Sequence, residues 1–471
     1  MLRTWWHGWN RVVQAIWIVN AFFGSAGSVM GDTTLIFERL SSEPSFPGAA
    51  LQTLAAGDVD DDGKLDLVVA DAEGELLGVF FGLGDGTFLE PPSTYELSDY
   101  AGLRNVKLGD LNGDRALDIV AVSDSANAVI VMLNQGAGVF GPPAGFSTGE
   151  APLAVAVDDW NGDGRLDVAT ANNLEDSVSV FLGDGRGGLM LQPDPVVVGA
   201  GPVAIAAGDL NGDRQLDLVV ASTTSGELSV GSVSILAGLG TGAFTPSAEI
   251  QGEFIDTPVG VILDDFNGDG RLDLAVVNQD LDDVAIFRND GGFTFQHVGN
   301  FPVAVQLNGC VGADFNRDAR VDIACAGEFD DKVAVVLGAG DGSFGPPVSF
   351  DVGPAPGAIA LGDFDRDGWF DLAVTSQDLE TVTILLNRTG ATPGTPSPTP
   401  TPTPTPPATC VGDCGRDGEV TIDELILMVN VALGITSVQN CAPGDANGDG
   451  EITIDEIIQA VNRALSGCPS A

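Results

Sequence analysis

A nine-residue loop with carboxylate or amide side chains at alternate positions occurs seven times in this chain of 471 residues. The first copy lies within "GDVDDDGKLDLVVA", and successive copies begin 49 to 56 residues apart. A period of this size is typical of propellers and solenoids, in which each repeat forms one supersecondary unit. The loops begin at Asp58, Asp110, Asp159, Asp209, Asp265, Asp314 and Asp363.

Each repeat contains the same order of strand-length segments. An apolar segment such as "PLAVAV" precedes the loop, segments such as "LDVAT" and "SVSVFLG" follow it, and a glycine-rich turn leads to a fourth extended piece. This pattern predicts a four-stranded antiparallel sheet. Residues 65–70 are apolar nearly throughout, which favours sheets covered on both faces. We therefore predict an all-β seven-bladed β-propeller of four-stranded antiparallel blades, within the usual range of roughly four to eight blades.

The two ends of the repeat array support a closed ring. The seventh repeat lacks its fourth strand, whereas the N-terminal stretch "DTTLIFERLSSEPSF" has no loop of its own. The N-terminal strand is therefore predicted to complete the seventh blade. A linear solenoid would instead need capping repeats.

The spacing of the acidic residues predicts calcium sites. Calcium is a hard cation that takes roughly six to eight oxygen ligands, and a tight loop supplies them from alternate positions. Loop positions 1, 3, 5 and 9 would offer side-chain oxygens and position 7 a main-chain carbonyl. Without a cation, such close carboxylates would repel one another and raise their pKa values. The predicted ligands are Asp58, Asp60, Asp62, Asp66, Asp110, Asn112, Asp114, Asp118, Asp159, Asn161, Asp163, Asp167, Asp209, Asn211, Asp213, Asp217, Asp265, Asn267, Asp269, Asp273, Asp314, Asn316, Asp318, Asp322, Asp363, Asp365, Asp367 and Asp371.

Two other interpretations of the loops remain open. They could be solvated acidic turns without metal, although solubility alone does not explain the alternation. Alternatively, the ions could be purely structural, stabilising the fold by binding only the folded state. We favour structural calcium for all seven loops.

Residues 33–387 resemble the FG-GAP/VCBS repeat family, and the ring resembles the calcium-bearing propeller of integrin α subunits. The resemblance rests on seven D-x-[DN]-x-D-x-x-[LVF]-D loops and on turns such as "GLGDGTF" and "GAGDGSF". It implies a calcium-binding propeller that presents loops to a ligand. The loops differ at position 6, where turn geometry is expected to vary: this position is Gly63, Gly164, Gly270 and Gly368 in four loops and Arg115, Arg214 and Ala319 in the others.

Proline and threonine alternate in residues 389–409, which predicts an extended linker after a propeller of residues 32–388. Residues 410–471 contain two loop–helix repeats 32 residues apart, each with an EF-hand-type loop. Gly415 offers no side chain at position 3, so the first site is expected to be the weaker. The predicted ligands are Asp413, Asp417 and Glu424 in the first loop and Asp445, Asn447, Asp449 and Glu456 in the second.

This tandem resembles a dockerin domain, a small all-α calcium domain. The resemblance implies docking onto a cohesin-like module of another protein. Cellulosomal dockerins carry a Ser/Thr pair at loop positions 10 and 11, where this chain has Ile422, Asp423, Ile454 and Asp455. A different partner, or a cohesin of another specificity, is therefore expected. The alternative is a calcium-stabilised cap without a partner.

Several features predict a secreted, extracellular or cell-surface protein. Residues 1–31 read as a signal peptide with cleavage near Ser28 or Gly31, and an uncleaved anchor is the alternative. Six cysteines fit an oxidising compartment, and Cys310 and Cys325 are placed to form a disulfide across a hairpin. Sequence leaves three pairings open for the other cysteines. The net charge of −48 argues against nucleic-acid and acidic-membrane partners.

Catalysis has little support in the sequence, and no catalytic residue is predicted. The chain has two histidines, His7 in the predicted signal peptide and His297, which we interpret as an ordinary strand residue. Trp160 is predicted to lie in the core, and Trp369 to be a partly buried filler or, alternatively, a sugar-stacking residue. We predict a calcium-binding adhesion protein whose propeller binds carbohydrate or an extracellular protein. The rival is a polysaccharide-degrading lyase or hydrolase tethered by the same C-terminal module.

Overall fold

The computed structural model describes residues 35–46, 51–72, 75–223 and 231–390, and residues 414, 420–432, 441, 452, 453, 457, 460 and 461 of the C-terminal region. The chain divides into two compact units, Met1–Gly390 and Ala391–Ala471. The predicted signal peptide and residues 391–409 of the predicted linker lie outside the described residues. Within the described part, no helix is long and apolar enough to cross a membrane.

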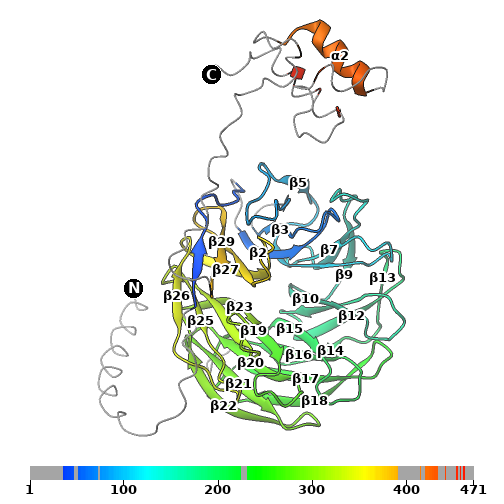
Figure 1. Cartoon of the computed structure of the whole chain (residues 1–471). Coiled ribbons are helices and arrows are strands. Elements are labelled where there is room, and N and C mark those ends of the chain that lie inside the picture. The colour runs from blue at the N-terminus through cyan, green and yellow to red at the C-terminus, as the bar shows by residue number, and fades with distance from the viewer. Residues whose placement is uncertain are drawn as a thin grey trace, which may run out of the picture. The chain divides into compact units, whose positions relative to one another are not determined.

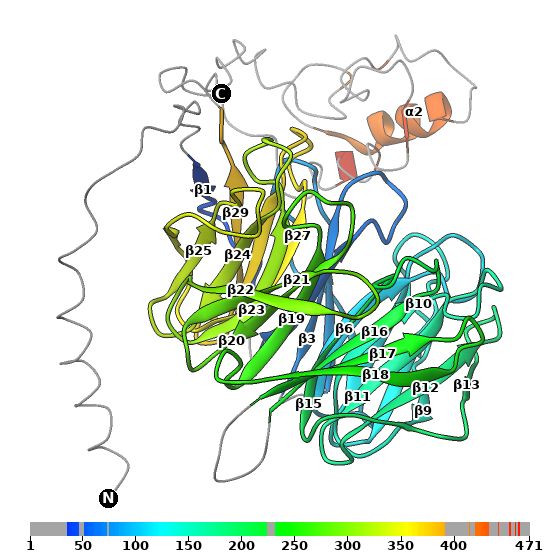
Figure 2. The same cartoon turned by 90° about the horizontal axis from the view of Figure 1, so that it is seen from below.

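The first unit is a ring of seven antiparallel sheets, which confirms the predicted propeller (Figure 1, Figure 2). In each of the first six blades the strands follow chain order from the inner to the outer edge. The third blade differs slightly, because its outer edge is divided into two short strands that both pair with the third strand.

The strands of blades 1 to 4 have the following bounds. Blade 1 contains β2 (Leu51–Gly57), β3 (Asp66–Asp71), β4 (Leu76–Phe80) and β5 (Ser93–Glu96). Blade 2 contains β6 (Leu103–Gly109), β7 (Asp118–Ser123), β8 (Ala128–Met132) and β9 (Ala144–Ser147). Blade 3 contains β10 (Pro152–Asp158), β11 (Asp167–Asn172), β12 (Ser177–Gly183), β13 (Leu189–Leu191) and β14 (Val196–Val197). Blade 4 contains β15 (Pro202–Gly208), β16 (Asp217–Ser222), β17 (Ser232–Gly238) and β18 (Phe244–Gln251).

The remaining blades complete the ring. Blade 5 contains β19 (Pro258–Asp264), β20 (Asp273–Asn278), β21 (Asp283–Asn289) and β22 (Phe295–Pro302). Blade 6 contains β23 (Leu307–Ala313), β24 (Asp322–Gly327), β25 (Lys332–Val336) and β26 (Val348–Asp351). Blade 7 contains β27 (Pro356–Gly362), β28 (Asp371–Ser376), β29 (Thr381–Asn387) and, from the N-terminal end of the chain, β1 (Phe37–Arg39).

The core of the propeller lies between the blades. Every residue of each second strand, from β3 in blade 1 to β28 in blade 7, is buried. Such strands read as nearly continuous apolar runs because a neighbouring blade covers each face of the sheet. Seven apolar clusters fill the seven interfaces between adjacent blades. Trp160 belongs to one of them, between blades 3 and 4, which confirms its predicted core position.

The N-terminal strand closes the ring as predicted. β1 pairs antiparallel with β29, and Phe37 lies opposite Asn387 (Figure 2). The backbone N–H of Arg388 donates to the carbonyl of Ile36 at 2.7 Å, which extends the pairing by one residue. Phe46, which is 4% exposed, then packs in the cluster between blades 7 and 1. The last blade is therefore built from both ends of the propeller sequence.

Adjacent blades are also joined by a repeated hydrogen bond to the carbonyl of loop position 2. Three interfaces use an asparagine Nδ2 donor: Asn134 to Val59 (2.7 Å), Asn289 to Leu210 (2.8 Å) and Asn387 to Phe315 (2.9 Å). Three others use a backbone N–H from the glycine-rich turn: Gly86 to Phe364 (3.0 Å), Gly187 to Leu111 (3.2 Å) and Gly342 to Phe266 (3.0 Å). We call these bonds the interblade bonds. They attach each of these six loops directly to the next blade.

Removing an asparagine donor should destabilise the propeller. Asn289 is fully buried, and its Nδ2 also donates to the carbonyl of Leu272 at 2.9 Å. Asn289→Ala leaves two buried carbonyls without this donor, and we expect the free energy of unfolding to fall by about 2–4 kcal/mol. Chemical denaturation checks this value. Gln296→Ala, which removes an exposed amide from β22, is the matched control and should change it by less than about 0.5 kcal/mol.

The described part of the C-terminal unit contains one helix, α2 (Ile422–Ala432). Thr421 precedes the helix, and its N–H and hydroxyl both donate to Oε2 of Glu424, at 2.8 and 2.9 Å. The bond from the Thr421 N–H is one half of a capping box, in which the side chain of the third helical residue accepts the N–H of the residue before the helix. The N–H of Ile457 donates to the carbonyl of Thr453 at 3.1 Å, as that of Leu425 does to Thr421 in the first repeat. One cluster, which includes Met428 and Ala460, joins the repeats.

Candidate metal centres

The seven acidic loops occupy the same place in every blade. Each connects the inner strand to the second strand, and the position 9 aspartate is the first residue of that second strand. Its backbone lies opposite the last residue of the inner strand, as Asp66 lies opposite Gly57. The loops therefore sit at one end of the inner strands, on one face of the ring.

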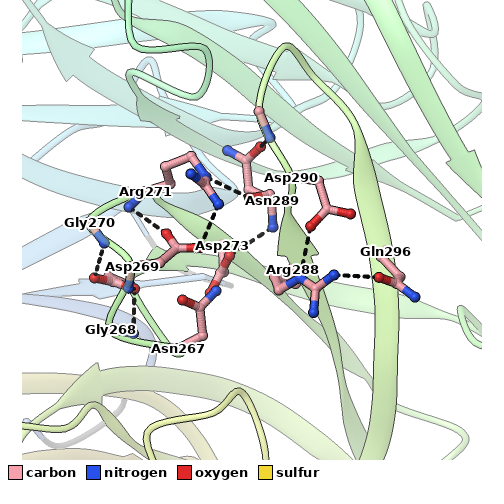
Figure 3. A network of polar contacts seen from close by, with 12 residues as sticks. Asn267, Gly268, Asp269, Gly270, Arg271, Asp273, Arg288, Asn289, Asp290 and Gln296 are labelled. Atoms are coloured by element: carbon pink, nitrogen blue, oxygen red, sulfur yellow. Dashed lines mark hydrogen bonds and ion pairs between the residues drawn. The ribbon is translucent and has the colours of Figure 1, made fainter.

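The carboxylate at position 1 organises the loop around itself. In loop 5, Oδ1 of Asp265 accepts the N–H of Asp269 at 3.0 Å and Oδ2 accepts the N–H of Gly270 at 2.7 Å. Figure 3 shows this turn, with the N–H of Arg271 donating to Oδ1 of Asp269 at 3.0 Å. The hydrogen bond from the N–H of position 6 to Oδ2 of position 1 recurs in all seven loops. Position 5 then accepts the N–H of position 7 in every loop. These bonds aim the side chains of positions 1 and 5 at the inside of the turn.

Position 6 has a left-handed backbone in every loop, so the expected variation in turn geometry is absent. Its φ is 80° at Gly63 and 77° at Arg115, and the other loops fall between 64° and 85°. Glycine adopts this conformation freely, whereas an L side chain costs roughly 1–2 kcal/mol. The hydrogen bond from position 6 to position 1 therefore holds even where arginine or alanine stands in the strained position.

The aspartate at position 9 differs from the other predicted ligands because it is fully buried and anchors the strand ends. In loop 1, Oδ2 of Asp66 accepts the N–H of Val59 and Oδ1 that of Gly82, both at 2.8 Å. Burial raises the pKa of this carboxyl to about 6, although the two N–H donors lower the pKa. The same position has a pKa raised to about 6 in Asp167 and Asp273, to about 7 in Asp322 and Asp371, and raised in Asp118 and Asp217.

Two loops bring three carboxylates especially close together. Among the described residues, oxygen atoms of Asp58, Asp60 and Asp66 lie within 4.8 Å of one another. Those of Asp363, Asp365 and Asp371 do the same in loop 7. In five loops position 3 is asparagine, so an amide oxygen takes the place of one carboxylate: Asn112, Asn161, Asn211, Asn267 and Asn316.

One oxygen in loop 7 has no hydrogen-bond partner. Oδ1 of Asp363 is buried and accepts no bond, whereas in the other six loops Oδ1 of position 1 accepts the N–H of position 5. A buried oxygen without a donor is costly unless a cation or water meets it. An oxygen-rich loop with such an atom fits a hard cation such as calcium.

Basic side chains at position 7 lie beside the position 5 carboxylates, a contact that was not predicted. Lys64 contacts Asp62 at 2.6 Å and Arg271 contacts Asp269 at 2.7 Å, and Arg165 and Arg320 face their position 5 aspartates at 3.5 and 3.8 Å. In loop 7, where position 7 is Trp369, Arg388 contacts Asp365 and also Asp367, the latter at 3.0 Å. These cations neutralise part of the loop charge. Their recurrence at one position was visible in the sequence.

Other predicted residues have the following places. Of the C-terminal ligands, Asp413, Asp417, Asp445, Asn447, Asp449 and Glu456 lie outside the described residues. Glu424 caps α2, and its role as a ligand stays a prediction. Disulfides join Cys310 to Cys325, as predicted, and Cys414 to Cys441, one of the pairings that sequence left open.

Two aromatic residues singled out for possible function have structural contacts. His297 lies in β22 and stacks on Phe254 with ring centroids 4.0 Å apart, which agrees with its interpretation as a strand residue. Trp369 is half-buried beneath the guanidinium of Arg317, whose Cζ lies 3.9 Å from the ring centroid. This covered face agrees with the filler interpretation of Trp369.

The repeats match a known family. The FG-GAP-like repeat matches six overlapping stretches, residues 58–121, 110–170, 159–220, 217–276, 265–325 and 314–374. Five of the six begin at the first residue of an acidic loop, and the other begins at the position 9 aspartate of loop 4. No curated protein matches the chain.

Solved structures resemble this chain at low sequence identity. BBS1N, crystallised with ARL6DN, is 15% identical over 73% of this chain and 96% of its own, with a TM-score of 0.50. An Agrocybe aegerita lectin that recognises non-reducing terminal N-acetylglucosamine is 19% identical over 73% of this chain and 86% of its own, with a TM-score of 0.44. Virginiamycin B lyase from Staphylococcus aureus is 11% identical over 74% of this chain and 99% of its own, with a TM-score of 0.46. The repeat matches span residues 58–374 and coincide with the loops and blades described above, and the chain therefore belongs to the family of proteins with FG-GAP-like repeats.

Proposed function

We propose that this protein is a secreted calcium-binding adhesion protein, in which seven calcium ions stabilise a ligand-binding propeller. The observation that carries the calcium proposal is the loop constellation, with its partnerless buried oxygen on Asp363. Calcium would meet the side-chain oxygens of positions 1, 3, 5 and 9 and the carbonyl of position 7. It would supply charge compensation and rigidity. Because position 2 carries an interblade bond in six of the seven loops, order in the loops would extend to the ring.

The calcium proposal can be tested by removing one charge from one loop. Asp163→Asn keeps Oδ1, which accepts the N–H of Arg165 at 3.0 Å, and removes only the negative charge of position 5. We expect one ion fewer per chain in calcium titration calorimetry or equilibrium dialysis. Asp184→Asn is the matched control, because Asp184 is an exposed aspartate in the neighbouring glycine-rich turn and its Oδ1 accepts two N–H donors. Equal calcium counts for both variants would contradict the assignment of loop 3.

Secretion and ligand binding rest on separate observations. The Cys310–Cys325 disulfide lies between β23 and β24, and a disulfide of this kind persists in oxidising compartments. The strongly negative chain disfavours nucleic acid and acidic membranes as partners. A propeller with FG-GAP-like repeats suits binding of carbohydrate or of an extracellular protein.

We further propose that the C-terminal unit is a dockerin-like module that binds a cohesin-like protein. The paired loop–helix repeats, with equivalent hydrogen bonds at Leu425 and Ile457, support this. The full-length chain should capture a cohesin-like protein from the native culture in calcium and release it in EDTA. A chain ending at Gly390 should capture none. If the full-length chain captures no such protein while calcium still stabilises it, the C-terminal unit is a stabilising cap instead.

A further inference from the structure

A cavity of about 560 Å³ lies at the centre of the ring. All seven inner strands line it, through their second to fourth residues and, in blade 2, also through the fifth, Lys107. Glu328 and Gln377 add side chains from neighbouring turns. The acidic loops follow the opposite ends of the same strands, so the cavity opens on the other face of the propeller. Its volume lies within the range of small-molecule sites, which is roughly 300–1,000 Å³.

One residue of the cavity lining breaks the sevenfold pattern of the inner strands. Two residues before the end of each inner strand, six blades carry Ala55, Ala156, Ala206, Ile262, Val311 and Ala360, whereas blade 2 carries Lys107. Lys107 lines the cavity and is accessible to the water within it. Among the described residues its ammonium makes no ion pair or hydrogen bond. Lys107 therefore brings an unpaired ammonium to the cavity, at a strand position where the other six blades carry aliphatic side chains.

The surroundings of the Lys107 ammonium favour an anionic ligand. Surrounding protein lowers the pKa of its amine through desolvation, and no carboxylate lies near enough to oppose this effect. The side chain is nevertheless exposed to the cavity, so an anion that enters can reach the ammonium and form a charge-assisted hydrogen bond with it. The other cation of the cavity, Arg104, already contacts Asp124 at 2.6 Å. Among the described residues that line the cavity, only Lys107 has a positive charge that no carboxylate contacts.

The mouth of the cavity has one polar side and one apolar side. Blades 1, 2 and 6 contribute Gln52, Arg104 and Asn308, whereas blades 3, 4 and 5 contribute Leu153, Val203 and Val259. Nδ2 of Asn308 donates to Glu328 at 3.2 Å, which places an acidic group at the polar side. This acidic group would repel a second negative charge on a ligand. The cavity thus favours a monoanion with one apolar face.

We propose that the central cavity binds a small organic acid that carries one carboxylate and several hydroxyl groups, such as a sugar acid. Its carboxylate pairs with the ammonium of Lys107. The C–H face of its ring lies against Leu153, Val203 and Val259, and its hydroxyls face the amide of Gln52. This site is independent of the calcium loops and goes beyond the function proposed above.

The test uses the calcium-loaded full-length chain and three probes in titration calorimetry: glucuronate, glucose and acetate. Glucuronate should bind at least about tenfold more tightly than either of the others, which lack the carboxylate or the ring. Lys107→Met should weaken glucuronate binding by about 10- to 100-fold. Because six blades already carry aliphatic residues at this level, the variant should fold and bind the same number of calcium ions. Lys332→Met, which removes an exposed ammonium paired with Asp351, is the control and should bind like the parent.

A second measurement follows Lys107 directly. The chain contains three lysines, Lys64, Lys107 and Lys332, so acylation at each can be followed by mass spectrometry. Glucuronate should slow the acylation of Lys107 and leave the other two unchanged. Equal affinity for glucose and glucuronate, no binding of glucuronate, or unchanged binding by Lys107→Met would overturn the proposal. None of these results would affect the calcium count, so this proposal and the calcium proposal fail separately.

Discussion

Without calcium, the propeller should lose stability as the pH rises from about 4 to about 8, and added calcium should restore it. The position 9 carboxyls have folded-state pKa values of about 6 in Asp66, Asp167 and Asp273 and about 7 in Asp322 and Asp371, above the ordinary value of 3.8. The folded state therefore holds these protons more tightly than the unfolded chain. The resulting stabilisation is fully present below pH 3.8 and is lost as the pH passes through 6 to 7.

The effect should be large because it is repeated around the ring. Each unit of pKa difference corresponds to about 1.4 kcal/mol, so several such carboxyls together contribute several kcal/mol, as an order of magnitude. Calcium binds the ionised carboxylates, and its stabilisation should grow with pH. Thermal denaturation of calcium-stripped protein at several pH values checks the loss of stability. The same measurement after calcium has been added back checks the recovery. Sodium chloride at matched ionic strength is the control for general screening of the charge of −48. A metal-free stability that stays constant or rises with pH would contradict the prediction.

Removing the N-terminal strand should have the second large effect. A chain beginning at residue 51 lacks β1 and the buried side chains of Leu35 and Phe46. It also loses Phe37, whose ring centroid lies 5.9 Å from that of Phe315 and 5.1 Å from that of Phe350. Burying each such side chain contributes roughly 1.5–3 kcal/mol, so the loss with the strand pairing should exceed about 6 kcal/mol. We expect the propeller to unfold or to melt far below the parent temperature.

A matched pair of truncations distinguishes ring closure from other effects of shortening. A chain beginning at residue 35 keeps β1 and should melt like the parent. A synthetic peptide of residues 35–46, added to the chain that begins at residue 51, should raise its melting temperature in proportion to the logarithm of peptide concentration once the peptide is in excess. If the two truncated chains are equally stable, the pairing of β1 with β29 contributes little to the ring.

The repeat period and the burial pattern predicted the propeller because both are local in the sequence. A run such as residues 65–70 shows that its strand is covered on both sides, and the missing fourth strand after residue 387 requires a donor from elsewhere. Positions 1, 5 and 9 of the loops were identified by the chemistry of their side chains. The burial of position 9, by contrast, depends on N–H donors up to 21 residues away, such as Gly238 for Asp217, and the loop pattern does not contain them.

Two long-range features were not predicted from the sequence. The interblade bond from Asn289 reaches Leu210, 79 residues earlier in the chain, and nothing near Asn289 identifies that acceptor. Lys107 was overlooked for a related reason. One lysine in an apolar strand has no local pattern, and it becomes distinctive only when all seven inner strands surround one axis.

The closure of the ring also has a kinetic consequence. The N–H of Ile36 donates to the hydroxyl of Thr389, a contact between residues 353 positions apart. Contacts of such high sequence separation form slowly, because much chain entropy is lost before they stabilise anything. During synthesis the N-terminal strand must wait for its partner until the last blade has been made. Once the ring has closed, no blade can leave without breaking contacts on two sides. The molecule should therefore fold slowly and unfold more slowly still, with a lifetime governed by its unfolding barrier as well as by its equilibrium stability.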